Sequence, residues 1–330
     1  MKIFFFKKKN FDDILKKKIS NFKKAELLSL LHRVNILSMI KNSGSGHIGT
    51  SFSALDLMIW IKFFQFKVSK KKIFDRDRNV FFSSKGHDVP ALYSILFALG
   101  LISFNKLLRF RKLYGLEGHP DIDTKGIEAN TGSLGMGISK AKGISWAKKY
   151  LKAKGYVIVL IGDGEFQEGQ IFESLQNISH QKTKKLIVIM DHNKVQSSDF
   201  VKNIINLGDI EAKIKSFGWN VLRINGHDYK EINNAFKISK KIKKKPSFII
   251  ADTIKGRGVS FMEHPFVMKK LKKYTWHSGA PSDEFYKIAI KELFKKIRQS
   301  YLKYRISLPK VVTVNFKDKS LTREKIIEFH

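Results

Sequence analysis

The sequence predicts an α/β fold in which a parallel sheet carries helices on both faces. Short runs rich in β-branched residues alternate with longer segments of helical period. Such alternation is typical of parallel strands joined by right-handed crossovers. At 330 residues, 43% of them hydrophobic, the chain can bury a large core. The predicted strands are 79–83, 156–161, 185–190, 220–224 and 248–251.

The predicted helices occupy the stretches before and between these strands. Residues 21–41 have amphipathic spacing, with Asn21 as the expected cap. Residues 53–64 are apolar nearly all round, which predicts a buried helix capped by Ser53. Residues 255–279, which include the basic insert Lys269–Lys273, lack periodicity and are predicted to form an active-site loop. Further helices are expected at 89–99, 138–151, 169–179 and 229–242.

Polar residues directly follow two of the predicted strands. The run 156–161 leads into Gly162-Asp163-Gly164, and the run 185–190 leads into Asp191 and Asn193. If the two strands are neighbours, an amide oxygen comes beside the first carboxylate at the edge where α/β folds bind ligands. Such oxygens, with a ligand's phosphate oxygens, suit magnesium. The pattern therefore predicts a site for a metal-bound diphosphate.

Four histidines lie in glycine-containing motifs rather than on apolar faces. They are His47, His87, His119 and His277. For any one alone, a structural role accounts for the residue at least as well as a functional one. Imidazoles gathered at one site can donate hydrogen bonds and move protons near neutral pH. The motifs that contain these histidines are 43–49, 83–87, 117–120 and 276–281. A fifth glycine-containing motif, without a histidine, is 130–135.

Composition excludes several classes of site. The chain has no cysteine, so disulfides, thiolate metal sites and a cysteine nucleophile are ruled out. The formal charge is +34, yet only ten of the 63 basic residues are arginine, the residue favoured for reading bases. We expect a solvated lysine surface without specific nucleic-acid recognition, and nonspecific nucleic-acid binding is the alternative. No apolar run is long enough for a membrane helix, so we expect a cytoplasmic protein that does not engage membranes.

These motifs, in this order, resemble those of the transketolase family over roughly residues 25–295. The closest resemblance is to the separately encoded amino-terminal halves of split transketolases. It implies the diphosphate-binding domain of the thiamin diphosphate-binding fold over 21–300, with a basic extension at 1–20 and a tail at 301–330. The cofactors implied are thiamine diphosphate and Mg²⁺.

The resemblance also assigns roles to individual residues. Asp163, Asn193 and the backbone carbonyl of Val195 are the implied metal ligands. His47 is implied in proton transfer with the donor ketose, His119 in substrate contact, and His87 and His277 at the diphosphate or reacting carbon, so all four are candidate catalytic residues. Other residues implied to bind the cofactor are Gly132, Ser133, Leu134, Gly162, Gly164, Glu168 and Asn193.

Three positions depart from the family pattern. Met136 replaces the usual glutamine, Asp88 replaces a small residue, and His192 stands where aspartate or asparagine is common. His192 is expected beside the metal ligands rather than on the metal.

The family takes the carboxylate that activates the cofactor from a second domain on a neighbouring subunit. The resemblance therefore implies a separate C-terminal, pyrimidine-binding subunit, two copies of each chain, sugar phosphate substrates and no activity alone. The implied reaction moves a two-carbon ketol unit from a ketose phosphate to an aldose phosphate. Half of a deoxyxylulose phosphate or dihydroxyacetone synthase, or a non-catalytic basic binding subunit, are the alternatives.

Overall fold

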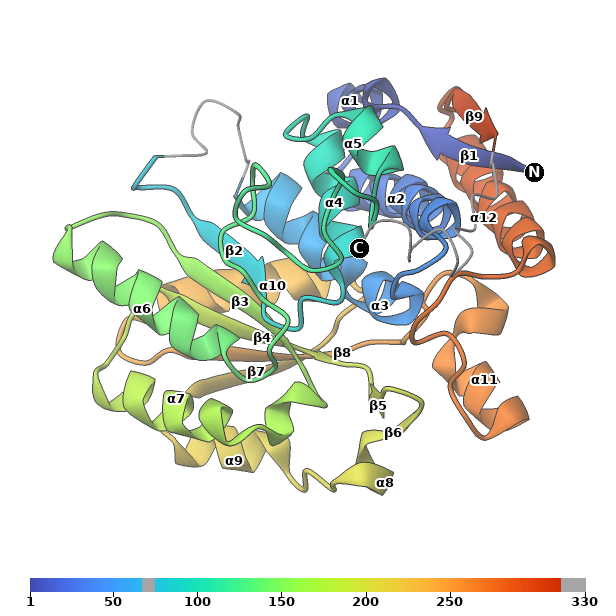
Figure 1. Ribbon diagram of the computed structural model, residues 1–330. Helices are drawn as coiled ribbons and strands as arrows, with labels where there is room; N and C mark the ends of the chain where they lie inside the picture. The colour runs from blue at the N-terminus through green and yellow to red at the C-terminus, as the bar shows by residue number, and fades with distance from the viewer. Residues whose placement is uncertain (67–74, 316–330) are drawn as a thin grey trace, which may run out of the picture.

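A five-stranded parallel sheet forms the centre of the molecule, as the alternation of strand and helix patterns predicts. The computed structural model describes residues 1–66 and 75–315. The strand order is β2-β3-β4-β8-β7 (Figure 1). All five predicted strands are confirmed, with bounds Val80–Ser83, Val157–Gly162, Leu186–His192, Ser247–Asp252 and Asn220–Asn225 in that order.

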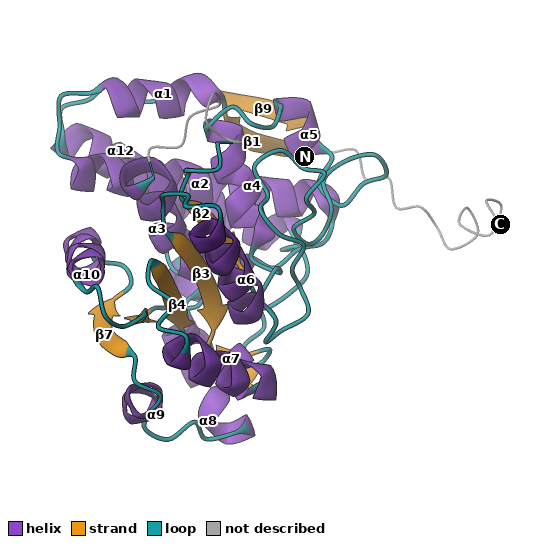
Figure 2. Ribbon diagram, turned by 90° about the vertical axis from the view of Figure 1, so that its left-hand side faces the viewer, coloured by secondary structure: helices purple, strands orange, loops and turns teal. Residues whose placement is uncertain are grey.

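Helices cover both faces of the sheet because alternate strand residues point to opposite sides. In β3, Ile158 and Leu160 join one core, whereas Val157, Val159 and Ile161 join the other. The two helical layers lie on either side of the strands in Figures 1 and 2. The first core is covered by α2 (Asn21–Ser43), α3 (Ile48–Ile59), α4 (Val89–Ala98) and α10 (Tyr229–Lys241), and the second by α6 (Gly137–Tyr150), α7 (Gly169–His180) and α9 (Ile210–Ser216).

Two predicted helix caps are wrong. The cap of α2 is Ser20 rather than Asn21, since the Ser20 side chain accepts a hydrogen bond from the Lys23 amide. Helix α3 begins at Ile48, so Ser53 lies inside it, and its hydroxyl donates to Asp191 at 2.6 Å. Because α3 is buried on all sides, its apolar pattern does not mark where the helix begins.

Several short elements have no counterpart in the sequence prediction. The segment 255–279 contains helix α11 (His264–Leu271), so it is not a continuous loop, and the basic insert forms the end of this helix and the turn after it. The hairpin β5–β6 follows the end of β4 and leads into α8. The other short elements are Phe104–Leu108 (α5), Val195–Gln196 (β5), Asp199–Phe200 (β6), Val201–Ile204 (α8) and the 3₁₀ turns Glu165–Gln167 and Ser260–Met262. The later part of the predicted helix 53–64 forms a π-helical turn, Trp60–Gln65.

The two terminal segments pair with each other on the outside of the first core. Strand β1 (Lys2–Phe6) runs antiparallel to β9 (Val311–Asn315), while α1 (Lys8–Lys16) and α12 (Asp283–Lys303) pack beside them. Phe6 and Asn35 exchange two hydrogen bonds, at 2.8 and 3.0 Å, which fix β1 on α2. The described parts of 1–20 and 301–330 therefore pack with residues 21–300, and residues 316–330 lie outside the described part of the chain.

We expect Phe5→Ala to lower the free energy of unfolding by about 3–5 kcal/mol, the usual cost of removing a buried phenyl ring. Phe5 is fully buried in β1, and its ring packs edge-on against Phe104 at 5.4 Å. Urea denaturation measures the change, with Lys2→Ala on the same strand as the control. Equal stability of Phe5→Ala and the parent chain would show that this strand contributes no core packing.

Among the described residues, no helix is both long and apolar enough to cross a membrane.

Candidate active site

Three of the four predicted site histidines form one cluster. His47 precedes α3, His87 follows β2, and His277 follows the segment that contains α11. Their ring centroids are 5.3 Å apart for His47–His87, 5.3 Å for His47–His277 and 5.7 Å for His87–His277. Residues more than two hundred positions apart thus meet in one small volume.

The three rings are uncharged at neutral pH. Burial, followed by the positive charge of Arg111, lowers the pKa of His47 to about 4, and burial with Lys255 lowers that of His277 to about 3. Burial also lowers the pKa of His87, whose Nδ1 lies 2.7 Å from the Lys85 carbonyl and donates to it. The Nδ1 atoms of His47 and His277 are buried without a hydrogen-bond partner. Each is left available to a bound group.

His119 joins the cluster through the turn at Gly132. A Cβ added to Gly132, whose φ is +140°, would lie 2.9 Å from Cδ2 of His119. A Cβ added to Gly86 would lie 2.8 Å from Gly132. Because of these close approaches, only glycine fits here. Ser133 and Leu134 lie on the same turn with their side chains exposed.

Asp163 and Asn193 meet at the carboxyl ends of β3 and β4. The two strands are parallel neighbours with Gly162 opposite Asp191, as the metal prediction requires. Asp163 accepts hydrogen bonds from the amides of Gly164 and Lys194. The Asn193 side chain accepts from the Val195 amide at 3.1 Å and donates to Asp191 at 3.2 Å. One carboxylate, one amide oxygen and one carbonyl are therefore close together.

This oxygen set fits a hard cation that takes further ligands from a diphosphate. The described residues contain no group of three or more His, Cys, Asp or Glu side chains able to hold a metal, so protein carboxylates and imidazoles do not complete a site here. Magnesium usually keeps several non-protein oxygens. A cation already contacts the predicted carbonyl ligand, since the Lys255 ammonium donates to the Val195 oxygen at 2.8 Å. Burial lowers the pKa of Lys255 to about 7, against the opposing charge of Asp163.

A buried polar network beneath the site was not predicted. The Lys85 ammonium contacts Asp191 at 2.5 Å and the Thr50 hydroxyl at 2.8 Å, and Thr253 also donates to Asp191. This network joins the end of β4 to α3, to the loop of His87 and to the end of β8. Lys85 lies within the motif 83–87, but the many lysines of the sequence gave no sign that Lys85 and Lys255 are buried.

Glu165 was also missed, although it stands two residues after Asp163. Its buried carboxylate accepts hydrogen bonds from the amides of Gly135 at 2.9 Å and Gly162 at 3.1 Å, and from the Ser84 hydroxyl. It thereby joins three loops of the site. Glu168, the predicted carboxylate, is exposed at the first residue before α7, with its Cβ against Gly135.

Asp88 places a second buried carboxylate beside Lys85. Its Oδ2 accepts from Ser83 at 2.8 Å and lies 3.5 Å from the Lys85 ammonium, whereas Oδ1 is buried without a partner. Burial raises its pKa above the ordinary aspartate value, although Lys85 and Ser83 oppose the rise. Ionised Asp88 therefore destabilises the folded chain relative to the protonated form.

We expect Asp88→Asn to remove a pH-dependent loss of stability. The pKa of Asp88 is higher in the folded chain than in the unfolded chain. The stability that protonated Asp88 contributes is therefore fully present below the unfolded-state pKa and is lost as pH rises through the folded-state pKa. The difference in unfolding free energy, variant minus parent, should grow from pH 4 to pH 7 by about 1.4 kcal/mol per unit of pKa difference. Urea denaturation at each pH measures it. A pH-independent difference would contradict this account.

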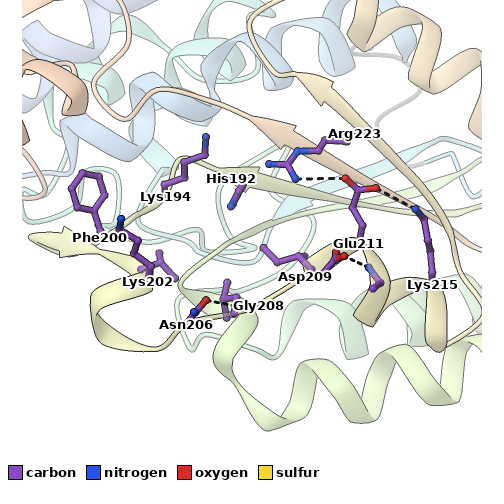
Figure 3. A pocket seen from close by; sticks show the side chains of 14 residues that line it. His192, Lys194, Phe200, Lys202, Asn206, Gly208, Asp209, Glu211, Lys215 and Arg223 are labelled. Atoms are coloured by element: carbon purple, nitrogen blue, oxygen red, sulfur yellow. Dashed lines mark hydrogen bonds and ion pairs between the residues drawn. The ribbon is translucent and has the colours of Figure 1, made fainter.

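A cavity of about 720 Å³ lies beside this edge of the sheet (Figure 3). His192 reaches it from β4, and its Nδ1 lies 2.7 Å from Asp252. Arg223 pairs with Asp252 at 2.7 Å and with Glu211 at 3.5 Å, and Lys215 pairs with Glu211 at 3.2 Å. These charges largely neutralise one another, so we place the candidate active site at the histidine cluster instead.

The sequence from 26 to 277 matches the family model described as transketolase, thiamine diphosphate binding domain. The chain belongs to the transketolase family. This transketolase domain is 36% identical over 277 residues to an apulose-4-phosphate transketolase subunit of Phocaeicola vulgatus, covering 83% of the chain and 95% of that protein. It is 34% identical to a 6-deoxy-6-sulfo-D-fructose transketolase subunit of a Clostridium species, covering 82% of the chain and 98% of that protein.

Longer transketolases share the same domain. The crystal structure of transketolase from Campylobacter jejuni superposes with a TM-score of 0.73 at 26% identity, covering 87% of this chain and 46% of that chain. Human transketolase is 30% identical over 268 residues, 81% of this chain and 41% of the human protein. This transketolase domain thus spans less than half the length of these two relatives.

Proposed function

We propose that the chain is the diphosphate-binding subunit of a two-chain transketolase. With a separate pyrimidine-binding subunit, it would transfer a two-carbon ketol unit from a ketose phosphate to an aldose phosphate. One observation carries the proposal: the cluster of His47, His87 and His277 occurs in the same chain as Asp163 and Asn193 at the carboxyl edge of the sheet. The cluster supplies neutral imidazoles, and the sheet edge supplies oxygen ligands for a metal-bound diphosphate.

Asp163, Asn193 and the Val195 carbonyl would hold Mg²⁺ and, through it, the diphosphate of thiamine diphosphate. When bound, this cofactor supplies a nucleophilic carbon that attacks the ketose carbonyl. The neutral imidazoles of His47 and His277 present unpaired Nδ1 atoms to a bound group, so they can hold or accept a proton there. His87 is oriented by its Nδ1 hydrogen bond to Lys85, which leaves Nε2 for the ligand.

A partner chain and the substrates belong to the same proposal. Two relatives that the chain matches over nearly their whole length are themselves named as transketolase subunits, which supports a separate partner chain. We infer an assembly of two copies of each chain in the cytoplasm, acting on sugar phosphates of the pentose phosphate pathway. The relatives' names show that other ketoses are used within the family, so the substrate must be measured.

Reconstitution tests the proposal. The chain is mixed with a co-purified pyrimidine-binding partner, thiamine diphosphate and Mg²⁺, and transfer from xylulose 5-phosphate to ribose 5-phosphate is followed. We expect transfer with both chains and none with either alone. Thiamine-dependent formation of deoxyxylulose phosphate or dihydroxyacetone in place of transfer would assign the site to another C2 or C3 transferase. Absence of thiamine diphosphate binding by the assembled chains would favour a non-catalytic binding subunit.

A further inference from the structure

A second cavity, of about 750 Å³, lies between the two terminal segments. Its walls are α1, the end of α12 and residues 306–312. Asn10 fixes the walls together, because its side chain donates to the Lys310 carbonyl and accepts from the Lys310 amide, both at 3.0 Å. All three walls lie outside residues 26–277, the range that matches the family model. The cavity shares no lining residue with the candidate active site and is separate from it.

Apolar side chains form one part of the lining of this terminal cavity. Ile14 and Tyr301 are the most buried of them, each 2% exposed, and the others are Ile306, Leu308, Pro309 and Val312. The Tyr301 hydroxyl is buried with no hydrogen-bond partner. A buried polar group without a partner destabilises the folded state, and this hydroxyl is a donor that a bound acceptor can satisfy.

Lysines surround the apolar interior. Lys9 pairs with Asp13 at 2.9 Å, and the Lys7 ammonium lies 3.6 Å from the centre of the Phe104 ring. The remaining three lysines of the lining have no acidic partner within the described chain; they are Lys16, Lys17 and Lys310. With Asp13 as its single acid, the lining favours an anion and disfavours a metal cation.

We propose that the terminal cavity binds a small amphipathic organic anion. Its carboxylate or sulfonate head would lie among Lys16, Lys17 and Lys310 and accept a hydrogen bond from Tyr301. Its hydrocarbon or aromatic body would pack on Ile14, Ile306 and Val312. A cavity of this size is typical of sites for small molecules.

The test uses 8-anilinonaphthalene-1-sulfonate as a fluorescent probe, displaced by decanoate, on the purified chain. We expect saturable probe binding that decanoate displaces and decanol displaces at least about tenfold less well, since a neutral head cannot pair with the lysines. Lys16→Glu with Lys17→Glu should weaken decanoate binding about tenfold or more. Tyr301→Phe, which keeps the ring, should weaken it about threefold, the loss of one ordinary hydrogen bond.

The control carries the same change of charge elsewhere. Lys287→Glu with Lys291→Glu alters two exposed lysines on α12 that do not line the cavity, and decanoate affinity should change less than about twofold. Circular dichroism and urea denaturation confirm that each variant is folded. Equal displacement by decanol and decanoate would overturn the proposal. So would equal weakening in the control and the Lys16, Lys17 variant, because binding would then follow overall charge.

Discussion

Asp163→Ala is expected to weaken binding of thiamine diphosphate and Mg²⁺ strongly while leaving the chain folded. Asp163 is 2% exposed, and it supplies the one carboxylate of the predicted ligand set. Removing one member of a buried charged pair usually costs about 2–5 kcal/mol, so cofactor affinity should fall at least about 30-fold. Isothermal titration calorimetry with thiamine diphosphate and Mg²⁺ measures the loss. Transfer by the reconstituted enzyme should fall in parallel.

The matched control for this variant is Glu211→Gln. Glu211 also lies near the carboxyl edge of the sheet, but it belongs to the neighbouring cavity of Figure 3, where it pairs with Arg223 and Lys215. Its substitution should leave cofactor affinity within about threefold, since screened surface pairs contribute little. Unchanged cofactor binding in Asp163→Ala would remove this residue from the metal site.

Asp56→Ala is expected to lower the free energy of unfolding by about 3–5 kcal/mol, because it leaves the Arg33 charge buried and unpaired. Asp56 is 5% exposed and contacts the Arg33 guanidinium at 3.0 and 3.3 Å. His227 contacts it at 2.8 Å and the Tyr229 hydroxyl at 2.9 Å. Urea denaturation at neutral pH measures the loss.

The same cluster supports the loop that carries Lys255. His227 accepts a hydrogen bond from the Ile254 amide at 2.9 Å, and Arg33 donates to the Arg257 carbonyl at 2.7 Å. Hydrogen exchange in residues 254–258 should therefore accelerate in Asp56→Ala. The control is Asp12→Ala, which breaks a half-exposed ion pair with Lys8 and should cost less than about 1 kcal/mol. Equal losses of unfolding free energy in the two variants would show that the buried ion pair contributes no more to stability than the half-exposed one.

The pH dependence of this pair has a definite sign. Burial alone would raise the pKa of Asp56, but Arg33 and His227 outweigh burial and hold it below the ordinary range. The stability that Asp56 contributes is therefore present above the unfolded-state pKa of about 3.8 and is lost as pH falls through the lower folded-state value. In the Asp56→Ala variant the acid-induced loss should be correspondingly smaller.

Much of the sheet could be predicted because buried parallel strands are signalled locally. A short continuous apolar run such as 186–190 favours a buried parallel strand when helical patterns flank it. The glycine turns after β3 and the histidine motifs are also local in sequence. The position of His87 follows from the strand order, because it comes just after β2. His47 and His277 are brought to it by a tertiary contact, in which the Gly49 amide donates to the Trp276 carbonyl at 3.0 Å.

What could not be predicted depends on contacts between distant residues. Glu165 and Lys85 act by joining loops whose proximity appears only in the folded chain. The start of α3 gave no periodic signal, because all of its faces are buried. Nor did composition distinguish the terminal strands, which lie within the segments described from sequence as a basic extension at 1–20 and a tail at 301–330.

The pairing of β1 with β9 can form only late in the synthesis of the chain. Asn10 and Lys310, which share two hydrogen bonds, are 300 residues apart. At ordinary translation rates of about 5–20 residues per second, β1 has been made roughly 15–60 s before its partner strand emerges from the ribosome. During that interval Ile3 and Phe5 lack the strand that completes their sheet. Closure of the first core is therefore a late event that follows translation of nearly the whole described chain.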